Sequence, residues 1–476
     1  MGWTDFLGEE VSLSSTDTVS GLNTGLAKRG TLTLISFLQY GLWLLLLTVP
    51  FHSVVVIPGV SVVKAIGFVV APFWLTWLVV RLGNSHWSWV MPRQNLRIFL
   101  SLAVFIASIL LSALYDSPSP VFLTSLTSLM LGSGMAIFIW TLVPSEAVLR
   151  RAYASLAVGG TILGLLVIFQ FVAPQEVSRI FGARIFLETI GETTVVRATG
   201  TFRDPNYAAL TLTVLACLSF YLALTYRRLW QRTLLLLGVA AQLVAVFLTF
   251  SRAGYITLAL VSLAILWREK HRIRFWKAAL VAAPVLVLLV GVGEGVFGLV
   301  SARAKTVIEF LHFLEEEPGR AREVDLSLWY RFQLLHAGIK MAFDKFPLGV
   351  GWENFRYRVT RYSKGVPELG AHNTYVATAA ELGLPGLVAL VWLFWLLWRS
   401  TGRLCKHGQG TIGLFSRGAR YSLLSVLIGG LFLTVFHEAV VWGTVGLVLA
   451  QNQIALNAAE PGKIGTFARY PSRTNM

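Results

Sequence analysis

Long apolar segments alternate with short polar or basic segments along almost the whole chain. Most are long enough to cross the hydrocarbon core of a bilayer, about 30 Å, as a helix. A spanning segment must be helical here, because an isolated strand would leave its backbone amides unpaired in lipid. We therefore predict an all-α polytopic membrane protein with about twelve transmembrane helices. The expected ranges are 31–50, 61–80, 98–115, 120–143, 152–173, 207–226, 233–250, 253–267, 278–297, 375–398, 421–437 and 440–457.

Two of these spans are unusual. The span at 253–267 is short, and the span at 375–398 contains Gly383, Pro385 and Gly386. Boundaries read from such a pattern are expected to err by several residues.

Two connecting segments on the predicted outer side are long, 174–206 and 298–371. Within the second, Leu326–Phe346 has the spacing of an amphipathic helix. Pro347 ends this helix, and Leu348–Trp352 is predicted to turn back towards the bilayer. We expect a large, partly helical extracytoplasmic loop here, not a linker.

The basic residues predict the orientation. With the N-terminus inside, most Lys and Arg residues of the short loops lie in the cytoplasm, as the positive-inside rule requires. Eleven others lie in the long loop, and long loops do not obey the rule. We therefore expect a multi-pass protein of the cytoplasmic (inner) membrane with both termini inside. The expected parts are a cytoplasmic N-terminal segment without a cleavable signal (1–30), transmembrane helices 1–9 (31–297), the extracytoplasmic loop (298–371), transmembrane helices 10–12 (372–457) and a cytoplasmic tail (458–476).

Composition supports the same class of protein. Of 476 residues, 55% are apolar and 13% are charged, whereas a soluble domain carries about 25% charged residues. The net charge of +16 would favour nucleic-acid binding in a soluble chain, but in a membrane protein we interpret it as basic cytoplasmic loops. Cys217 lies in an apolar segment and Cys405 in a basic loop, so we expect neither a disulfide framework nor a thiolate metal site.

Three residues near the predicted outer surface carry candidate chemistry. Arg203 precedes the sixth span, next to Asp204, the expected cap of the following helix. It either reaches lipid head groups or offers an anion a bidentate site. Arg252 is flanked by apolar segments on both sides, which is costly unless an anion or a water-filled cavity compensates. His372, where the long loop re-enters the membrane, is either an interfacial side chain or a proton acceptor near neutral pH.

No metal-binding or nucleotide-binding motif accompanies these residues, since neither HExxH nor GxxxxGK[ST] occurs. His372-Asn373, followed after nine residues by Gly383-Leu-Pro-Gly386, resembles the histidine motif of the O-antigen ligase family, the superfamily of WaaL ligases and Wzy polymerases. Arg203 and Arg252 look like that family's two outer arginines, and Leu348–Phe355 (LGVGWENF) is similar to its loop segment. The first 150 residues match only in hydropathy.

The resemblance implies a metal-independent, inverting glycosyltransferase with a GT-C-like fold and no cofactor, acting in cell-envelope polysaccharide or lipopolysaccharide biosynthesis. It would move a glycan from an undecaprenyl-diphosphate donor to an acceptor hydroxyl of a lipid or glycan on the outer face, among membrane lipids and without nucleic acid. Arg203 and Arg252 would bind the diphosphate, and His372 would be the catalytic base. Further candidates for donor or acceptor contacts are Tyr330, Arg331, Asn373, His437 and Glu438.

Several alternatives stay open at this point. Ligases, polymerases and the related oligosaccharyltransferases that modify Ser or Thr in proteins use the same class of donor, and the sequence does not identify the acceptor. A secondary transporter is the alternative from another class. Against it, Lys64 is the main ionisable residue within a span, and broken helices do not recur in two matched halves.

Overall fold

The computed structural model describes residues 34–57, 60–83, 91–181, 184–190, 193–269, 305–314, 318–408 and 410–459. The first helical segment is Leu34–Phe51, which ends in the 3-10 turn η1 (Val49–Phe51). The long helices that follow are α2 (Val62–Leu82), α3 (Arg93–Tyr115), α4 (Phe122–Leu142), α5 (Glu146–Val172), α7 (Pro205–Ala223), α8 (Leu229–Leu248), α9 (Arg252–Arg268), α15 (Thr374–His407), α16 (Ile412–Gly429) and α17 (Ala439–Ala459). The elements between them are α6 (Pro174–Phe181), α12 (Pro318–Val324), α13 (Leu326–Asp344), α14 (Phe355–Tyr362) and two antiparallel hairpins, β1 (Val55–Ile57) with β2 (Val60–Ser61) and β3 (Phe186–Ile190) with β4 (Thr193–Arg197).

The predicted class, an all-α polytopic membrane protein, is confirmed. Nine helices of the described part of the chain are long and apolar enough to cross a membrane. Two further helices overlap predicted spans but fall short of that criterion: α9 has 17 residues, and α16 carries Arg417 and Arg420 among its 18. The predicted span at 278–297 lies outside the described residues.

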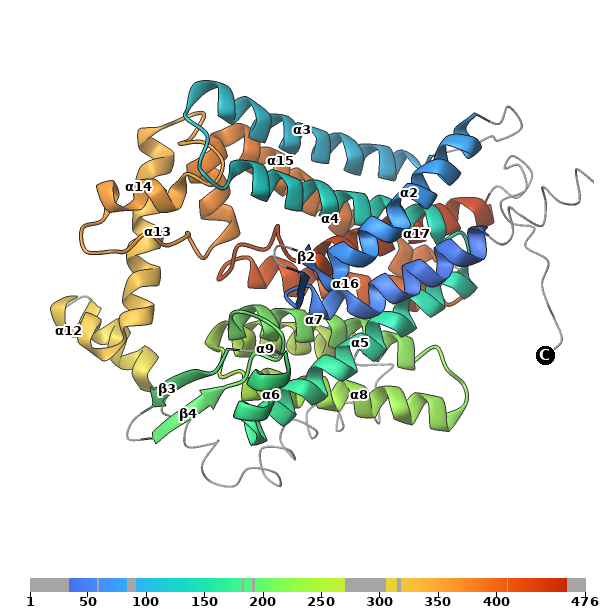
Figure 1. Ribbon diagram of the computed structural model, residues 1–476, viewed down its shortest axis with the longest axis horizontal. Helices are drawn as coiled ribbons and strands as arrows, with labels where there is room; N and C mark the ends of the chain where they lie inside the picture. Colours follow the sequence, from blue (N-terminus) through green and yellow to red (C-terminus); the bar gives the residue numbers. More distant parts are fainter. Residues whose placement is uncertain are drawn as a thin grey trace, which may run out of the picture.

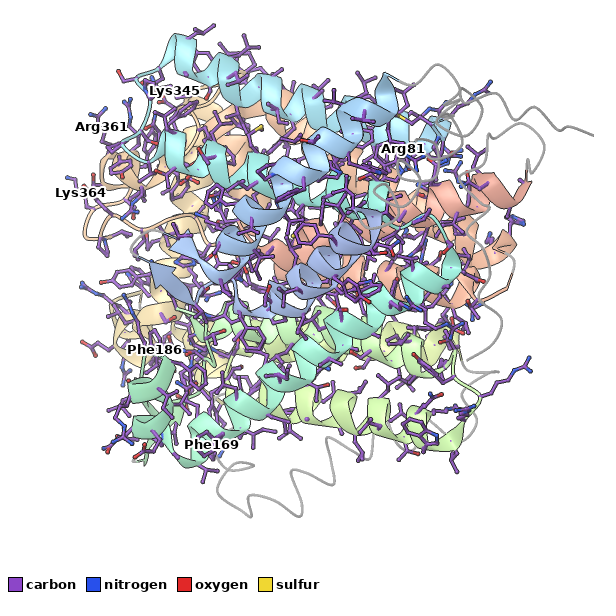
Figure 2. The ribbon with its side chains drawn as sticks, turned by 45° about the vertical axis from the view of Figure 1, so that its right-hand side comes forward. Arg81, Phe169, Phe186, Lys345, Arg361 and Lys364 are labelled. Atoms are coloured by element: carbon purple, nitrogen blue, oxygen red, sulfur yellow. The ribbon has the colours of Figure 1, made fainter. Side chains whose placement is uncertain are left out.

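The long helices form a bundle along the longest axis of the molecule, and α13 crosses one end of it (Figure 1). The β3–β4 hairpin and α12 lie at that same end, which we call the capped end. Figure 2 shows Phe186, Lys345, Arg361 and Lys364 there and Arg81, in the last turn of α2, at the other end. The long polar loop therefore folds over one end of the bundle, as the amphipathic spacing of Leu326–Phe346 predicts.

Helix burial divides the bundle into a core and a periphery. In the most apolar 18-residue stretch of each helix, 89% of the α7 residues and 83% of the α17 residues are buried. Only 11% of the α2 residues are buried in the same way. A helix that is apolar on all sides suits a fully enclosed position, and α7 packs between α5, α8 and α16. The weakly buried α2 lies at the edge of the bundle.

The helix α15 is broken at Gly383, which has φ of 59° and ψ of −152°. The segment before α14 satisfies the backbone groups that the break releases. Val350 N–H donates to the Ala380 carbonyl and Gly351 N–H to the Glu381 carbonyl, each at 2.8 Å, and Leu384 N–H donates to the Pro347 carbonyl at 2.8 Å. Non-helical backbone within a bundle is tolerated where protein groups pair with it in this way.

The structure corrects two sequence predictions. The span predicted at 421–437 is α16 at Ile412–Gly429, and 430–438 is irregular. The predicted range missed the first part of this helix because Arg417 and Arg420 interrupt the apolar run, although Arg417 is paired with Glu269 at 2.7 Å. In the outer segment 174–206, the β3–β4 hairpin was not predicted at all.

Candidate functional site

A cavity of about 620 Å³ lies at the capped end. Its walls come from the β3–β4 hairpin, the beginning of α7, the first turns of α13 and the residue that precedes Asn373, the cap of α15. We call it the capped-end cavity. Its lining residues are Glu188, Arg197, Asp204, Asn206, Thr306, Val324, Asp325, Leu326, Ser327, Tyr330, Arg331, Leu334, Leu369 and His372.

His372 is held in this wall by the start of α15. Asn373 is the N-cap: its Oδ1 accepts from the N–H groups of Tyr375 and Val376 at 3.0 Å, and its Nδ2 donates to the Leu431 carbonyl at 3.0 Å. His372 itself has φ of 49°, a backbone conformation that is uncommon outside glycine. Asn373, expected among the substrate contacts, is therefore occupied with backbone groups, and its capping fixes where the imidazole lies.

The surroundings of His372 favour the neutral imidazole. Burial lowers its pKa, the positive charge of Arg331 lowers it further, and Asp204 opposes both effects. At neutral pH the ring is unprotonated and can accept a proton.

Arg331 and Tyr330 lie beside His372, on the second turn of α13. The Arg331 guanidinium donates to the Phe432 carbonyl at 3.4 Å and has no carboxylate partner within the described part of the chain. Burial lowers the pKa of Arg331, with Arg252 and Arg197 acting in the same direction and Asp204 in the opposite one. Since an arginine keeps its charge under such conditions, Arg331 is a cation available to a ligand in the cavity.

Arg252 lies behind the wall, at the first position of α9. It forms an ion pair with Asp325 at 2.6 Å, and the two side chains are 19% and 8% exposed. Asp325 is also the N-cap of α13 and accepts from Leu328 N–H at 2.9 Å. Arg252 thus fixes the start of the helix that carries Arg331, and it reaches the cavity only through its carboxylate partner.

Arg203 does not line the capped-end cavity. Its side chain is exposed and makes no hydrogen bond or ion pair to any residue that the structure describes. Its neighbour Asp204 lines the cavity and caps α7, with Oδ1 accepting from Asn206 N–H at 2.7 Å, as expected. Asn206 in turn accepts from Ser251 Oγ at 2.6 Å, which ties the start of α7 to the start of α9.

Sequence reasoning missed a second ion pair at this site. Arg197 and Glu188 face each other across the β3–β4 hairpin at 3.0 Å, and both line the cavity. The sequence does not single out Arg197, because its partner is set by a hairpin that the apolar pattern does not predict. Asp325 could have been found, since an Asp directly before an amphipathic helix is a capping signal.

His437 and Glu438 lie apart from the capped-end cavity, in the irregular segment 430–438. His437 Nε2 is 3.0 Å from Glu353 Oε1, and Glu438 Oε2 is 3.4 Å from His52 Nε2. Burial, together with the charge of Asp204, raises the pKa of Glu438 to about 8. Burial also lowers the pKa of His52 to about 4, so both members of that pair are neutral at pH 7.

The segment 430–438 lies between the capped-end cavity and the pairs made by His437 and Glu438. From the cavity side, Arg331 bonds the Phe432 carbonyl and Tyr207 Oη donates to the Thr434 carbonyl at 3.2 Å. The described residues contain no cluster of three or more His, Cys, Asp or Glu side chains that could hold a metal ion.

Comparison with protein families supplies the deciding observation. Residues 237–391 match the Wzy_C family, described as O-antigen ligase. The chain carries an O-antigen ligase domain. The comparison with curated proteins returned no match. The O-antigen ligase domain covers Arg252, Arg331 and His372, and Arg203 and the segment 430–438 lie outside it.

The match confirms the family resemblance seen in the sequence. The matched family implies a membrane enzyme that transfers glycans, of the O-antigen ligase or polymerase type, and the apolar helices agree with a multi-pass membrane protein. Lipid-linked glycans are the class of substrate that the domain implies. The roles assigned to individual residues remain predictions.

Proposed function

We propose that the protein is a metal-independent, inverting glycosyltransferase, similar to an O-antigen ligase, that acts on the outer face of the cytoplasmic membrane. It transfers a glycan from an undecaprenyl-diphosphate donor to an acceptor hydroxyl. The observation that carries this proposal is that His372 and Arg331 line one cavity. Arg252 is ion-paired with Asp325, which lines the same cavity.

The arginines around the cavity could bind a diphosphate in place of the carboxylates that now pair with two of them. Arg197 and Arg252 are paired with Glu188 and Asp325, and Arg331 has no such partner in the described residues. A diphosphate would first contact Arg331 and then take over guanidinium bonds now made by the two carboxylates. The N-termini of α7 and α13 at the same cavity add partial positive charge.

Transfer requires that negative charge be stabilised on the leaving diphosphate. Fixed guanidinium groups supply this stabilisation, and removing one such donor costs about 10²–10³ in rate. We assign Arg252 and Arg203 to the diphosphate, with Arg331 beside them. For Arg203, whose side chain is exposed at the start of α7, this assignment requires that its guanidinium turn towards the bound donor.

His372 is the proposed base. An acceptor hydroxyl becomes a nucleophile when its proton is taken as it attacks, and a neutral imidazole in the same cavity can take it. One displacement inverts the anomeric centre, breaks its bond to the diphosphate oxygen and leaves the proton on His372. Base catalysis of this kind contributes about 10²–10⁴ to the rate.

The test is transfer by the purified protein from an undecaprenyl-diphosphate glycan. We expect His372→Ala to lower the rate by about 10²–10⁴, and Arg203→Ala and Arg252→Ala by about 10²–10³ each. Arg252→Lys should also be slow, because a point charge does not replace the bidentate fork. His336→Ala is the matched control, since His336 is exposed on α13 and does not line the cavity.

Near-normal transfer by the His372→Ala protein would remove the proposed base. Retained anomeric configuration in the product, measured by NMR, would reject the single displacement. Supplying a lipid acceptor or a carrier-linked glycan as alternative acceptors separates a ligase from a polymerase. Glycan uptake by liposomes that His372→Ala leaves unchanged would favour a transporter instead.

A further inference from the structure

A second hollow lies on another side of the segment 430–438. It is a groove of about 300 Å³ between the first helix, α2, α4 and the start of α17. It shares no lining residue with the capped-end cavity. We call it the α2 groove, and its role is not covered by the proposed transfer reaction.

Two glycines border the open space of the α2 groove. A Cβ atom added at Gly67 of α2 or at Gly134 of α4 would meet no atom within 4 Å, so both glycines border open space. One end is closed by Trp74, whose Nε1 donates to Thr141 Oγ1 at 3.0 Å and whose ring packs edge-on against Phe138 at 5.6 Å. From Trp74 to Lys64 the groove follows α2 for ten residues, about 15 Å at 1.5 Å per residue.

The α2 groove opens sideways, where a bilayer would lie. Only 11% of the residues in the most apolar stretch of α2 are buried, and the lining residue Phe68 is 59% exposed. On the α4 side, Met130 and Leu131 are 39% and 40% exposed. The exposed apolar rim and the apolar interior together fit a hydrocarbon chain.

The end of the α2 groove opposite Trp74 contains a basic residue, Lys64. Lys64 lies in the first turn of α2, and His52 and His437 line the groove with it. No Asp or Glu is among the lining residues that the structure describes, and the Lys64 ammonium has no hydrogen bond or ion pair to any of the described residues.

The acids nearest to this end do not neutralise Lys64. Glu353 is already bonded to His437, and the buried Glu438 is protonated at neutral pH, because its pKa is raised to about 8. The N-termini of α2 and α17 face the same end, since Ser61 and Ala439 both line it. An unpaired ammonium beside two helix N-termini is complementary to an anion.

We propose that the α2 groove binds an anionic glycerophospholipid of the surrounding bilayer. One hydrocarbon chain lies along α2 as far as Trp74, and the phosphate is bound by Lys64. The lipid is thus a second ligand, separated from the donor cavity by the segment 430–438.

The test is thermal unfolding of the full-length protein in detergent, followed by tryptophan fluorescence while phosphatidylglycerol or phosphatidylcholine is titrated. We expect phosphatidylglycerol to raise the unfolding temperature of the wild type more than phosphatidylcholine does. Lys64→Gln should weaken the apparent affinity for phosphatidylglycerol about fivefold, the effect of about one surface charge. Lys64→Arg and the control Lys364→Gln, which alters an exposed lysine at the capped end, should keep it.

Filling the groove provides the second variant. Gly134→Leu should abolish stabilisation by phosphatidylglycerol, while the unfolding temperature without lipid shows whether the fold is intact. Equal stabilisation of the wild type by the two lipids, or an unchanged affinity in Lys64→Gln, would overturn the proposal. So would displacement of phosphatidylglycerol by undecaprenyl diphosphate, which would assign the groove to the donor. None of these readouts depends on glycan transfer, so the two proposals fail separately.

Discussion

At the scale of single residues, the charges around His372 act in opposite directions. Burial and Arg331 lower the pKa of the imidazole, and Asp204 raises it. Because the proposed base acts only when unprotonated, transfer is expected to fall as the pH drops through this lowered pKa. The position of that acid limb therefore reports which charges face His372.

Replacing Arg331 separates its charge from its contacts. Arg331→Gln removes a positive charge, so the protonated imidazole becomes less unfavourable and its pKa rises. The acid limb of kcat/KM should move to higher pH in Arg331→Gln and stay in place in Arg331→Lys, although both variants lose rate. Asp204→Asn, which can still cap α7, should move the limb to lower pH. A limb at the same pH in Arg331→Gln and Arg331→Lys would show that the charge of Arg331 does not act on His372.

At the scale of elements, the break in α15 joins the two sequence motifs of the family resemblance. Gly383 belongs to the histidine motif, and Val350 and Gly351 belong to the loop segment LGVGWENF. The structure shows them as one contact, with the loop N–H groups bonded to the carbonyls that precede the break. The loop is also held to the end of α3, where Tyr115 Oη donates to the Leu348 carbonyl.

Gly383→Ala should destabilise the protein. A Cβ atom there would lie 1.9 Å from the Pro347 carbonyl oxygen, and φ of 59° is unfavourable for alanine. We expect a loss of at least about 2 kcal/mol, measured as a fall of several degrees in unfolding temperature. Gly370→Ala is the control, since an added Cβ there meets no atom within 4 Å. Equal unfolding temperatures for the two variants would contradict this account of the break.

The sequence predicted most helices of the bundle because length and apolar content suffice to define a spanning segment. It misplaced α16, where two partly buried arginines have partners outside this helix. Arg420, for example, donates to the Trp398 carbonyl at 2.8 Å and lies 3.6 Å from the centre of that indole ring.

The same limit applies to the candidate site. The cap Asp204 was predictable, since a cap and its helix are adjacent in the chain. The partner of Arg252 was not, because Asp325 lies 73 positions away and is brought close only by the fold.

At the scale of the whole molecule, the proposed reaction depends on which side the capped end faces. Lys364 and Arg81 lie at opposite ends of the bundle (Figure 2). From the positive-inside rule we predict that the Arg81 end lies in the cytoplasm and the capped end outside.

Sided labelling tests this orientation. In a background carrying Cys217→Ser and Cys405→Ser, a membrane-impermeant maleimide should modify Lys364→Cys in intact cells. It should modify Arg81→Cys only after the membrane is permeabilised. Labelling of Arg81→Cys in intact cells would place the proposed donor cavity on the wrong side of the membrane.

The hydrogen bonds of Val350 and Gly351 to α15 also divide the long loop. The chain returns to α15 directly after α13, so only the stretch from α14 to Ala371 forms a loop that begins and ends at α15. Cleavage of the exposed Lys364-Gly365 bond would leave two fragments that are still joined by the backbone hydrogen bonds between Val350, Gly351 and α15. We therefore expect the segment that carries Arg331 and the segment that carries His372 to stay associated after the chain between them is cleaved.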